Sequence, residues 1–349
     1  MDISRYTDTT ELKFDVEFVT PTFLGGADGN AEIRTAPFKN LLRRWWRIVN
    51  GRLSPEELWK KESELFGSTE KNSDTGKIFG KSKVELKIEG IENVQDLLSN
   101  QLLFIGKDGI SDLALYTGYG SVSAGKNIRQ NEKTYIKAGT KIKVSLRCPS
   151  YASEELKKSL FCIHLFGAIG SRSRNGWGSI SLFPKSFNFD IKKHFPNYVK
   201  FKDALSGKKL YPFCIAADDF GILCWKTSEF DSWKIAFEMV AKLYHQLIQD
   251  LKSDDKKYNT EWRKLLGFAD SNTRSPSQLL LKVVSKVDKF SQKKFYGMII
   301  HIPYLVQNWE EKSDNEQFRV WKFVHEWLDN TDELNGMFGR KKLQELENE

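Results

Sequence analysis

The sequence predicts an α+β fold made of two halves, and three observations support this fold class. Strand-like and helix-like periods follow one another through the first half in the order strand, helix, strand, strand, helix, strand. A second mixed series of the same kind begins at about residue 212. The chain has 349 residues, of which 40% are hydrophobic, so it can build two packed cores. We place the halves at residues 1–190 and 198–349, with an insertion at about 104–132.

The elements of the first half follow from hydrophobic periodicity in chain order. A period of two residues predicts strands, and a period of 3.6 residues predicts helices. The predicted strands lie at about 11–19, 84–88, 142–146 and 179–183, and the predicted helices at about 36–49, 54–66 and 153–167. Ser54 and Glu57 have the spacing of a capping box, and Ser153 is expected to cap the last helix. Residues 67–83 predict a loop, and the element order is that of a ferredoxin-like unit.

The second half is predicted to be a looser copy of the same pattern. Strand material is expected over about 212–226, a long amphipathic helix over 230–252, a strand pair over 278–287 and 294–305, and a helix over 314–329. The basic cluster from Gly339 to Lys342 predicts a frayed end with solvated charges.

The composition favours a polyanionic partner. Lysine and arginine total 54 against 46 acidic residues, which gives a formal net charge of +8 and a pI of about 9.0. The cysteines have no C-x-x-C spacing, so we expect buried, reduced thiols at Cys148, Cys162, Cys214 and Cys224. The N-terminal residues are too polar for a signal peptide, and no run approaches the roughly 20 apolar residues of a membrane helix. These patterns predict a cytoplasmic protein with no membrane span, metal or cofactor.

The segment FLGGADGNAEIRTAPFKNLLRRWWR, residues 23–47, joins a glycine turn to a helix with two different faces. Trp45 lies in the middle of the apolar stripe and is expected in the core, whereas Trp46 lies at its edge and could be buried or exposed. The opposite face carries no acid between Thr35 and Asn50. Because arginine pairs with phosphate through two parallel hydrogen bonds, this face is a candidate for an RNA backbone; the alternative is an ordinary solvated face. Its cations are Lys39, Arg43, Arg44 and Arg47.

A second motif, GAIGSRSRNGWG at residues 167–178, combines glycines with arginines and a tryptophan. In an extended stretch Arg172 and Arg174 would project to the same side, and Trp177 could stack on an unpaired base. The alternative is a structural turn whose arginines lie in solvent. The candidate RNA-contacting residues of this loop are Arg172, Arg174, Asn175 and Trp177. Glycines allow positive φ and a close approach to a ligand, and the candidates in the two motifs are Gly25, Gly26, Gly170, Gly176 and Gly178.

Catalytic candidates are few in this sequence. None of the five histidines belongs to an H-x-x-x-H metal pair. His164 lies on a nearly all-apolar helix and His301 in an apolar strand, so both are expected to be satisfied core or interface histidines. The residue pattern therefore gives no reason to expect an enzyme.

Together the two motifs resemble those of the RAMP superfamily of CRISPR proteins, and the first resembles the signature of the Cmr subunit one family of the type III-B (Cmr) effector complex. The segment RSPSQLLLKV at Arg274–Val283 is also similar to that family. The resemblance implies two ferredoxin-like (RRM-like) halves packed together, with helical and loop insertions. It implies a non-catalytic RNA-binding subunit in antiviral defence that holds the 3′ region of the guide RNA and helps to engage complementary target RNA. Other RAMP subunits of the Cmr complex are the implied protein partners.

Two alternatives remain open. One is a metal-independent endoribonuclease of the same superfamily that processes guide RNA precursors, with His164 or His301 as general acid or base. The other is a scaffold whose basic helix meets an acidic patch on a neighbouring subunit. Cleavage of repeat RNA without metal would indicate the first, and arginine substitutions that abolish assembly without changing RNA affinity would indicate the second.

Overall fold

The first half of the chain folds around a four-stranded antiparallel sheet. The computed structural model describes residues 8–26, 30–71, 75–76, 78–91, 98–101, 116–118, 130–205, 214–253, 262–269, 274–304 and 314–340. In chain order the elements are β1 (Thr9–Phe18), α2 (Thr35–Val49), α3 (Pro55–Phe66), β4 (Glu85–Ile91), β7 (Lys141–Pro149), α5 (Ser153–Phe166) and β8 (Ile180–Pro184). The sheet order is β4-β7-β1-β8, which confirms the predicted ferredoxin-like unit with α3 inserted.

The second half repeats this topology. Its elements are β12 (Cys224–Thr227), α8 (Trp233–Ser253), β15 (Leu279–Val287), β16 (Lys293–His301), α11 (Asp314–Asn330) and β17 (Leu334–Gly336). The sheet order β15-β16-β12-β17 places the first and third strands of the unit in the middle, as in the first half. The fold class predicted from the sequence, α+β with two ferredoxin-like halves, is therefore confirmed.

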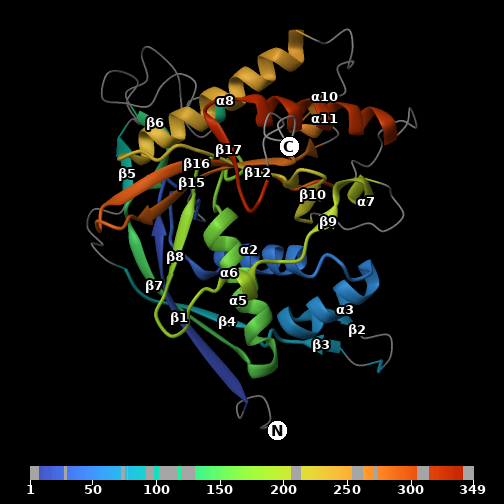
Figure 1. The fold of residues 1–349 in the computed structure, drawn as a ribbon. Coiled ribbons are helices and arrows are strands. Elements are labelled where there is room, and N and C mark those ends of the chain that lie inside the picture. The colour runs from blue at the N-terminus through green and yellow to red at the C-terminus, as the bar shows by residue number, and fades with distance from the viewer. Residues whose placement is uncertain are drawn as a thin grey trace.

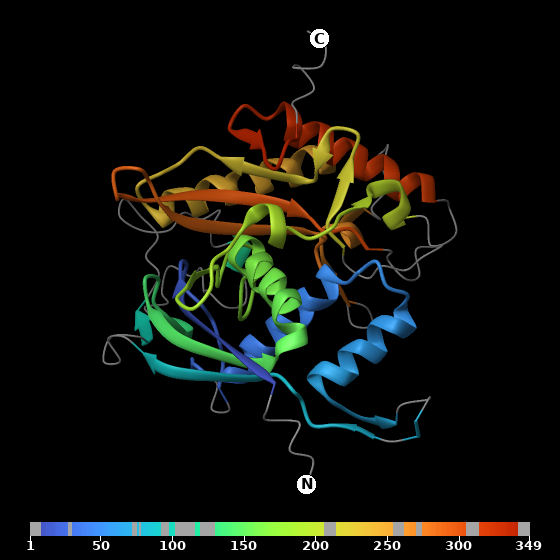
Figure 2. The same cartoon turned by 60° about the horizontal axis from the view of Figure 1, so that its bottom comes forward.

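The two halves stack in layers. From bottom to top of Figure 1 these are the first sheet, helices α2 and α5, the second sheet, and helices α8 and α11; Figure 2 shows the same stack after rotation. One hydrophobic core joins the first sheet, α2 and α5 to the near face of the second sheet. Another joins the far face of the second sheet to α8 and α11. The second sheet is thus covered on both faces, which explains the nearly continuous apolar run of β15.

The edge of the second sheet is completed by the first half. The Leu281 amide of β15 donates to the Arg174 carbonyl oxygen over 2.8 Å, and the Val283 amide donates to Ser179 Oγ over 3.1 Å. Between these two residues, fully buried Lys282 points into the first half. Its ammonium donates to the carbonyl oxygens of Ile163 and His164, over 3.0 and 2.6 Å, in the last turn of α5.

Shorter elements connect these units. They are β2 (Ser68–Lys71), β3 (Ile78–Gly80), β5 (Leu98–Gln101), β6 (Gln130–Ile136), η2 (Ser150–Ala152), α6 (Ile191–His194), β9 (Val199–Lys200), α7 (Phe201–Leu205), β10 (Ala216–Asp218), β11 (Gly221–Ile222), α10 (Trp262–Leu265), β13 (Phe268–Ala269) and β14 (Arg274–Ser275). Because β2 and β3 pair, residues 67–83 are not the simple loop predicted. Most of the predicted insertion at 104–132 lies outside the described residues.

Two predictions about residues that cap helix N-termini differ in outcome. The capping box of Ser54 and Glu57 is confirmed at the start of α3. Ser153 is not a cap, because the 3-10 turn η2 leads directly into α5 and Ser153 is already its first helical residue.

The predicted frayed C-terminal cluster is wrong at Arg340. Its side chain is fully buried and forms ion pairs with Asp218 over 2.7 Å and Asp329 over 2.6 Å. The guanidinium also lies over the Trp225 ring, 4.5 Å from its centroid. Partners that are distant in sequence therefore fix this arginine, while Lys341 and Lys342 lie outside the described residues.

Candidate RNA interface

The two sequence motifs lie side by side and form one structural unit. The Ser171 amide donates to the Phe23 carbonyl oxygen over 2.8 Å, and the Gly178 amide donates to the Pro21 carbonyl oxygen over 3.0 Å. The ring centroids of Phe23 and Trp177 are 5.5 Å apart. Segments far apart in the sequence therefore hold one another in place.

Three glycines of the second motif have positive φ and approach other parts of the chain. Gly170, Gly176 and Gly178 have φ of 91°, 90° and 65°. A Cβ at Gly170 would lie 2.6 Å from the Phe23 carbonyl oxygen, and one at Gly176 would lie 2.7 Å from the Phe237 ring. A Cβ at Gly178 would overlap a neighbouring carbonyl at 1.8 Å. The sequence predicted that these glycines let the backbone come close to a ligand. In the structure they let it come close to other parts of the same chain.

The glycine turn of the first motif closes as a small hairpin. Gly25 pairs with Ala31 in an antiparallel bridge, and the Gly26 amide donates to the Asn30 carbonyl oxygen over 2.6 Å. A Cβ at Gly26 would lie 2.7 Å from a Glu32 carboxylate oxygen, whereas one at Gly25 would meet nothing within 4 Å. An approach of RNA to this turn remains a prediction for Gly25, which is exposed.

Trp177 does not offer a stacking face, so that prediction is wrong. Its side chain is 0% exposed. The ring lies 5.5 Å from that of Phe23 and 4.8 Å from that of Phe237 on α8. Its indole Nε1 donates to Thr117 Oγ1 over 3.2 Å, and the Asn175 side-chain amide donates to the Thr117 carbonyl oxygen over 3.0 Å. Both residues therefore anchor the loop within the fold.

Arg172 and Arg174 face different surroundings. Arg172 is exposed and has a φ of 57°, so the stretch is not extended and the predicted common side is lost. The Arg174 guanidinium donates to the Ser277 carbonyl oxygen in the second half. Burial, and then the nearby Arg44 cation, lower the pKa of Arg174. Arg174 is half-buried, as is Arg44 of the first motif, so Arg172 is the more accessible arginine of this loop.

The other cations of α2 share an acid from the next helix. Glu62 of α3, with a side chain only 6% exposed, accepts hydrogen bonds from Arg43 Nε and from Arg47 Nε and Nη2, the last over 2.5 Å. The face is therefore less cationic than its own helix predicts, although both arginines keep an exposed side. Lys39 is half-buried, and burial and then Arg43 lower its pKa, with Glu85 opposing them.

Comparison with known proteins now gives a family match. Residues 15–181 match the model of the RAMP superfamily, a span that runs from β1 to β8 and contains both motifs. The matched span is slightly less than half of the chain, and the unit formed by the two motifs lies within it.

The chain is similar to a curated Cmr subunit and to two solved structures. The CRISPR system Cmr subunit Cmr1-2 of Pyrococcus furiosus is 28% identical over 188 residues, which cover 49% of this chain and 95% of that protein. The crystal structure of Cmr1 from Pyrococcus furiosus in the apo form shares the fold, with a TM-score of 0.50, 16% identity, and coverage of 88% and 92%. A cryo-EM structure of the type III-B Cmr-beta bound to cognate target RNA aligns with a TM-score of 0.48 at 11% identity, covering 90% and 100%.

The two histidines that could serve as a general acid or base lie in the interior of the protein. His164 Nδ1 accepts the Leu182 amide over 3.2 Å, and burial first, then Lys282, lower the pKa of His164 to about 4. His301 is 0% exposed and lies 2.9 Å, nitrogen to nitrogen, from His325. Both have the satisfied interior role expected from the sequence. Among the described residues, no group of three His, Cys, Asp or Glu side chains has the arrangement of a metal site.

Two further expectations can be compared with the described part of the chain. No helix in it is both long and apolar enough to span a membrane. The four cysteines are buried thiols, as predicted, and burial raises the pKa of Cys148 to about 11 and that of Cys214 to about 12.

The structure also contains a basic and aromatic groove that was not predicted from the sequence. Its lining includes Arg52, Lys192, Phe195, Tyr198 and Phe338. A local signal did exist, because residues 191–198 combine lysines with two aromatic residues. Arg52 and Phe338 gave no such signal, since only the fold brings them to this segment.

Proposed function

We propose that this chain is a non-catalytic RNA-binding subunit of a type III-B (Cmr) CRISPR effector complex in the cytoplasm. In this role it holds the 3′ region of the guide RNA, helps to engage complementary target RNA and works beside other RAMP subunits in antiviral defence. The match of residues 15–181 to the RAMP superfamily model and the similarity to a curated Cmr subunit support this assembly.

The observation that carries the RNA-binding role is the contact between the two cation-bearing motifs. The Ser171 amide of the second motif donates to the Phe23 carbonyl oxygen of the first over 2.8 Å. Exposed Arg172 follows Ser171 in the chain, and Arg43 and Arg47 keep an exposed side on the helix of the first motif. Arginine pairs with phosphate through two parallel hydrogen bonds, so these side chains are suited to an RNA backbone.

The test removes the outer cations of α2 without leaving a buried charge. Arg43→Ala and Arg47→Ala are combined with Glu62→Gln, because Glu62 would otherwise lose both partners. Binding of RNA weakens as salt rises, so the slope of log K against log salt is negative. If both arginines contact the backbone of single-stranded RNA, the variant's slope is less steep by about 1.4, at about 0.7 for each lost contact. Binding is measured with guide RNA and with guide–target duplex across a salt series.

The matched control is Arg147→Ala, which removes the same net charge from an exposed position on β7. An equal slope for the triple variant and the control would remove this helix face from the RNA site. Crosslinking of the assembled complex then maps which end of the guide RNA the chain contacts. Contact at the 5′ end would contradict the proposed role at the 3′ region.

A further inference from the structure

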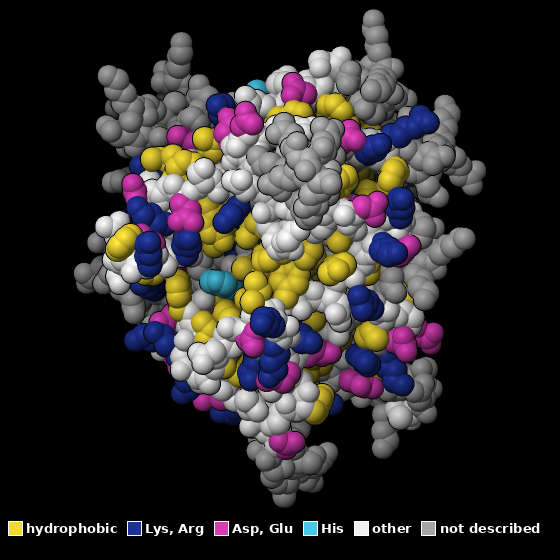
Figure 3. Space-filling model, viewed as in Figure 1, with side chains coloured by type: hydrophobic (Ala, Val, Ile, Leu, Met, Phe, Trp, Pro, Cys, Tyr) yellow, Lys and Arg dark blue, Asp and Glu magenta, His cyan; other side chains and the backbone are white. Residues whose placement is uncertain are grey.

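A surface groove of about 610 Å³ lies where the two halves meet. Arg52 enters it from the chain after α2, and Ile222 enters from β11 of the second half. Figure 3 shows hydrophobic side chains gathered in the middle of this face, around α6 and the segment that leads to β9, with lysines and arginines around them. This volume lies in the range of small-molecule and nucleotide sites, about 300–1,000 Å³.

Aromatic rings form one side of the groove. Phe195 and Phe338 are 4.7 Å apart, centroid to centroid, and Phe338 also packs edge-on against Phe166 of the core. Tyr198 is 49% exposed, which is unusual for a large ring beside other aromatic residues. A platform of rings anchored from below and open above is suited to stacking by an unpaired base.

Cations stand beside these rings. Arg52 Nη2 donates to the Tyr198 carbonyl oxygen over 2.8 Å, which holds the guanidinium next to the aromatic segment. Lys192 lines the same groove and is exposed. Among the described residues that line the groove, none is aspartate or glutamate. These residues therefore let a phosphate approach the cations without meeting a carboxylate.

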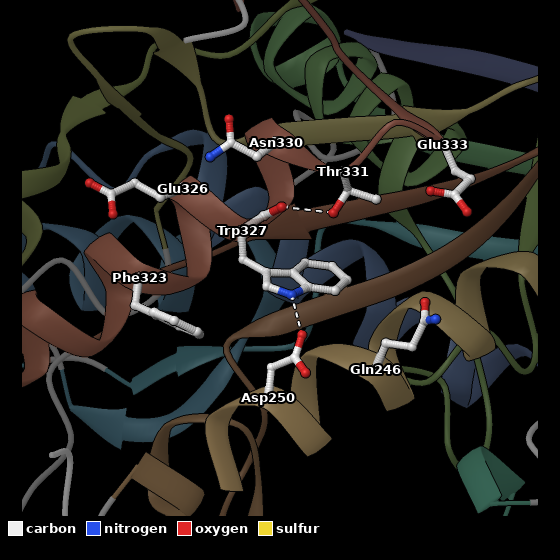
Figure 4. Close-up of a pocket in the computed structure, with 8 residues that line it drawn as sticks. All are labelled: Gln246, Asp250, Phe323, Glu326, Trp327, Asn330, Thr331 and Glu333. Atoms are coloured by element: carbon white, nitrogen blue, oxygen red, sulfur yellow. Dashed lines mark hydrogen bonds between the residues drawn. The ribbon is translucent and has the colours of Figure 1, made fainter. Parts of the chain in front are cut away.

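A second groove shows that these features are not shared by every hollow of this surface. It has a volume of about 570 Å³ and lies between α8 and α11. Figure 4 shows that three carboxylates line it, those of Asp250, Glu326 and Glu333, together with Trp327. In the part of the chain that the structure describes, no lysine or arginine lines it. This acidic groove would repel a polyanion, so among these two hollows the basic groove alone fits RNA.

We propose that the basic groove binds one or two unpaired nucleotides of RNA. Tyr198 and Phe195 stack on the bases, and Arg52 and Lys192 neutralise the phosphates. The inference rests on the RNA-binding function proposed above and assigns it a second contact, outside the two sequence motifs. Because stacking uses the face of a base and not its edges, the groove accepts any sequence.

The experiment compares Tyr198→Ala plus Lys192→Ala with a matched control, Tyr151→Ala plus Lys87→Ala, which removes an exposed tyrosine and an exposed lysine elsewhere. The probe is a ten-nucleotide oligouridylate, with a blunt RNA duplex of the same length beside it. We expect the groove variant to bind the single strand about tenfold more weakly, the loss typical of one stacked base. Tyr198→Phe keeps the ring and should bind like the wild-type chain, and thermal melting checks that every variant is folded.

Photocrosslinking with a 5-iodouridine oligonucleotide gives an independent readout, and a crosslink within residues 195–200 is expected. Equal affinity of the groove variant and the control, with wild-type binding intact, would overturn this inference and leave the proposed function standing. Unchanged RNA affinity with loss of a partner subunit from the assembled complex would also overturn it, since the occupant would be a protein. A wild-type chain that binds RNA neither alone nor in the complex would remove both proposals.

Discussion

The basic groove and the acidic groove have nearly equal volumes, about 610 and 570 Å³, and opposite linings. Each contains exposed aromatic surface, so aromatic content does not distinguish them. The difference lies in charge and in construction: the basic groove is built from both halves, whereas α8, α11 and the residues that follow α11 form the acidic groove within the second half. A hollow between two units can combine side chains that neither unit could place alone.

The largest effect is expected from Lys282, whose ammonium joins the halves. Lys282→Ala leaves two buried carbonyls of α5 with one partner fewer and opens a cavity, so we expect a loss of about 2–4 kcal/mol in the free energy of unfolding. Hydrogen exchange should increase around the basic groove more than around the acidic groove. The control is Lys286→Ala, an exposed position on the same strand whose ion pair with Glu229 is also exposed. Equal losses for the two variants would contradict a joining role for Lys282.

Charge reversal tests the contrast between the grooves directly. Arg52→Glu with Lys192→Glu should weaken binding of single-stranded RNA by about ten- to a hundredfold at low salt, because two attractive contacts become repulsive. Glu326→Lys with Glu333→Lys should not weaken it at all. Both variants are measured by fluorescence anisotropy at two salt concentrations. If reversal in the acidic groove reduced RNA affinity, the assignment of opposite roles would be wrong.

Acidification tests the histidine pair buried in the second half. His325 on α11 lies 2.9 Å from His301, and burial first, with Arg340 contributing, lowers the pKa of each. Below pH 6.5 the unfolded chain binds protons that the folded chain excludes, so stability falls as pH decreases, by about 1.4 kcal/mol per pH unit for each histidine. Urea unfolding between pH 7 and pH 5 measures the slope. His325→Gln should reduce it, and an unchanged slope would show that these histidines do not titrate on unfolding.

The smallest effect is expected at the hydrogen bond inside the acidic groove. The Trp327 indole Nε1 donates to Asp250 Oδ2 over 2.7 Å, at an exposed site (Figure 4). Asp250→Asn keeps an acceptor oxygen and removes the charge, so we expect a loss of about 0.5 kcal/mol and no loss of RNA affinity. Chemical denaturation and the same anisotropy assay check both quantities. A loss of RNA affinity at this position would connect the acidic groove to the RNA site.

The elements of the fold were predictable because their signals are local. Alternation of apolar residues located β1 and β7, and the 3.6-residue period located α2, α8 and α11. The two copies of one sheet order then follow from the order of elements. Ser153 was wrongly predicted to be the N-cap because a short 3-10 turn before it already has helical backbone. No side chain in that turn indicates this conformation.

The candidate site was less predictable, since its chemistry depends on distant partners. The glycines on either side of Trp177 suggested a ring free to stack on a base, but Phe237 of α8 covers it. The arginine row of α2 lacks acids of its own, and Glu62 of α3 supplies one. Arg340 lies in a run of cations near the end of the sequence, which predicted a solvated side chain. Ion pairs with Asp218 and Asp329 instead hold it in the protein interior. Local sequence gives the type of each side chain, whereas its exposure and charge state are set by the tertiary fold.

The contact between Arg174 and Leu281 has a consequence for how the chain can be divided. β15 is the outer strand of its sheet, and the first half occupies its outward-facing amides at Leu281 and Val283. A second half released by proteolysis or expressed alone would present these amides and a largely apolar strand to other chains, the usual start of edge-to-edge aggregation. During synthesis the first half leaves the ribosome before β15. The segment that pairs with the edge of β15 is therefore already present when this strand emerges.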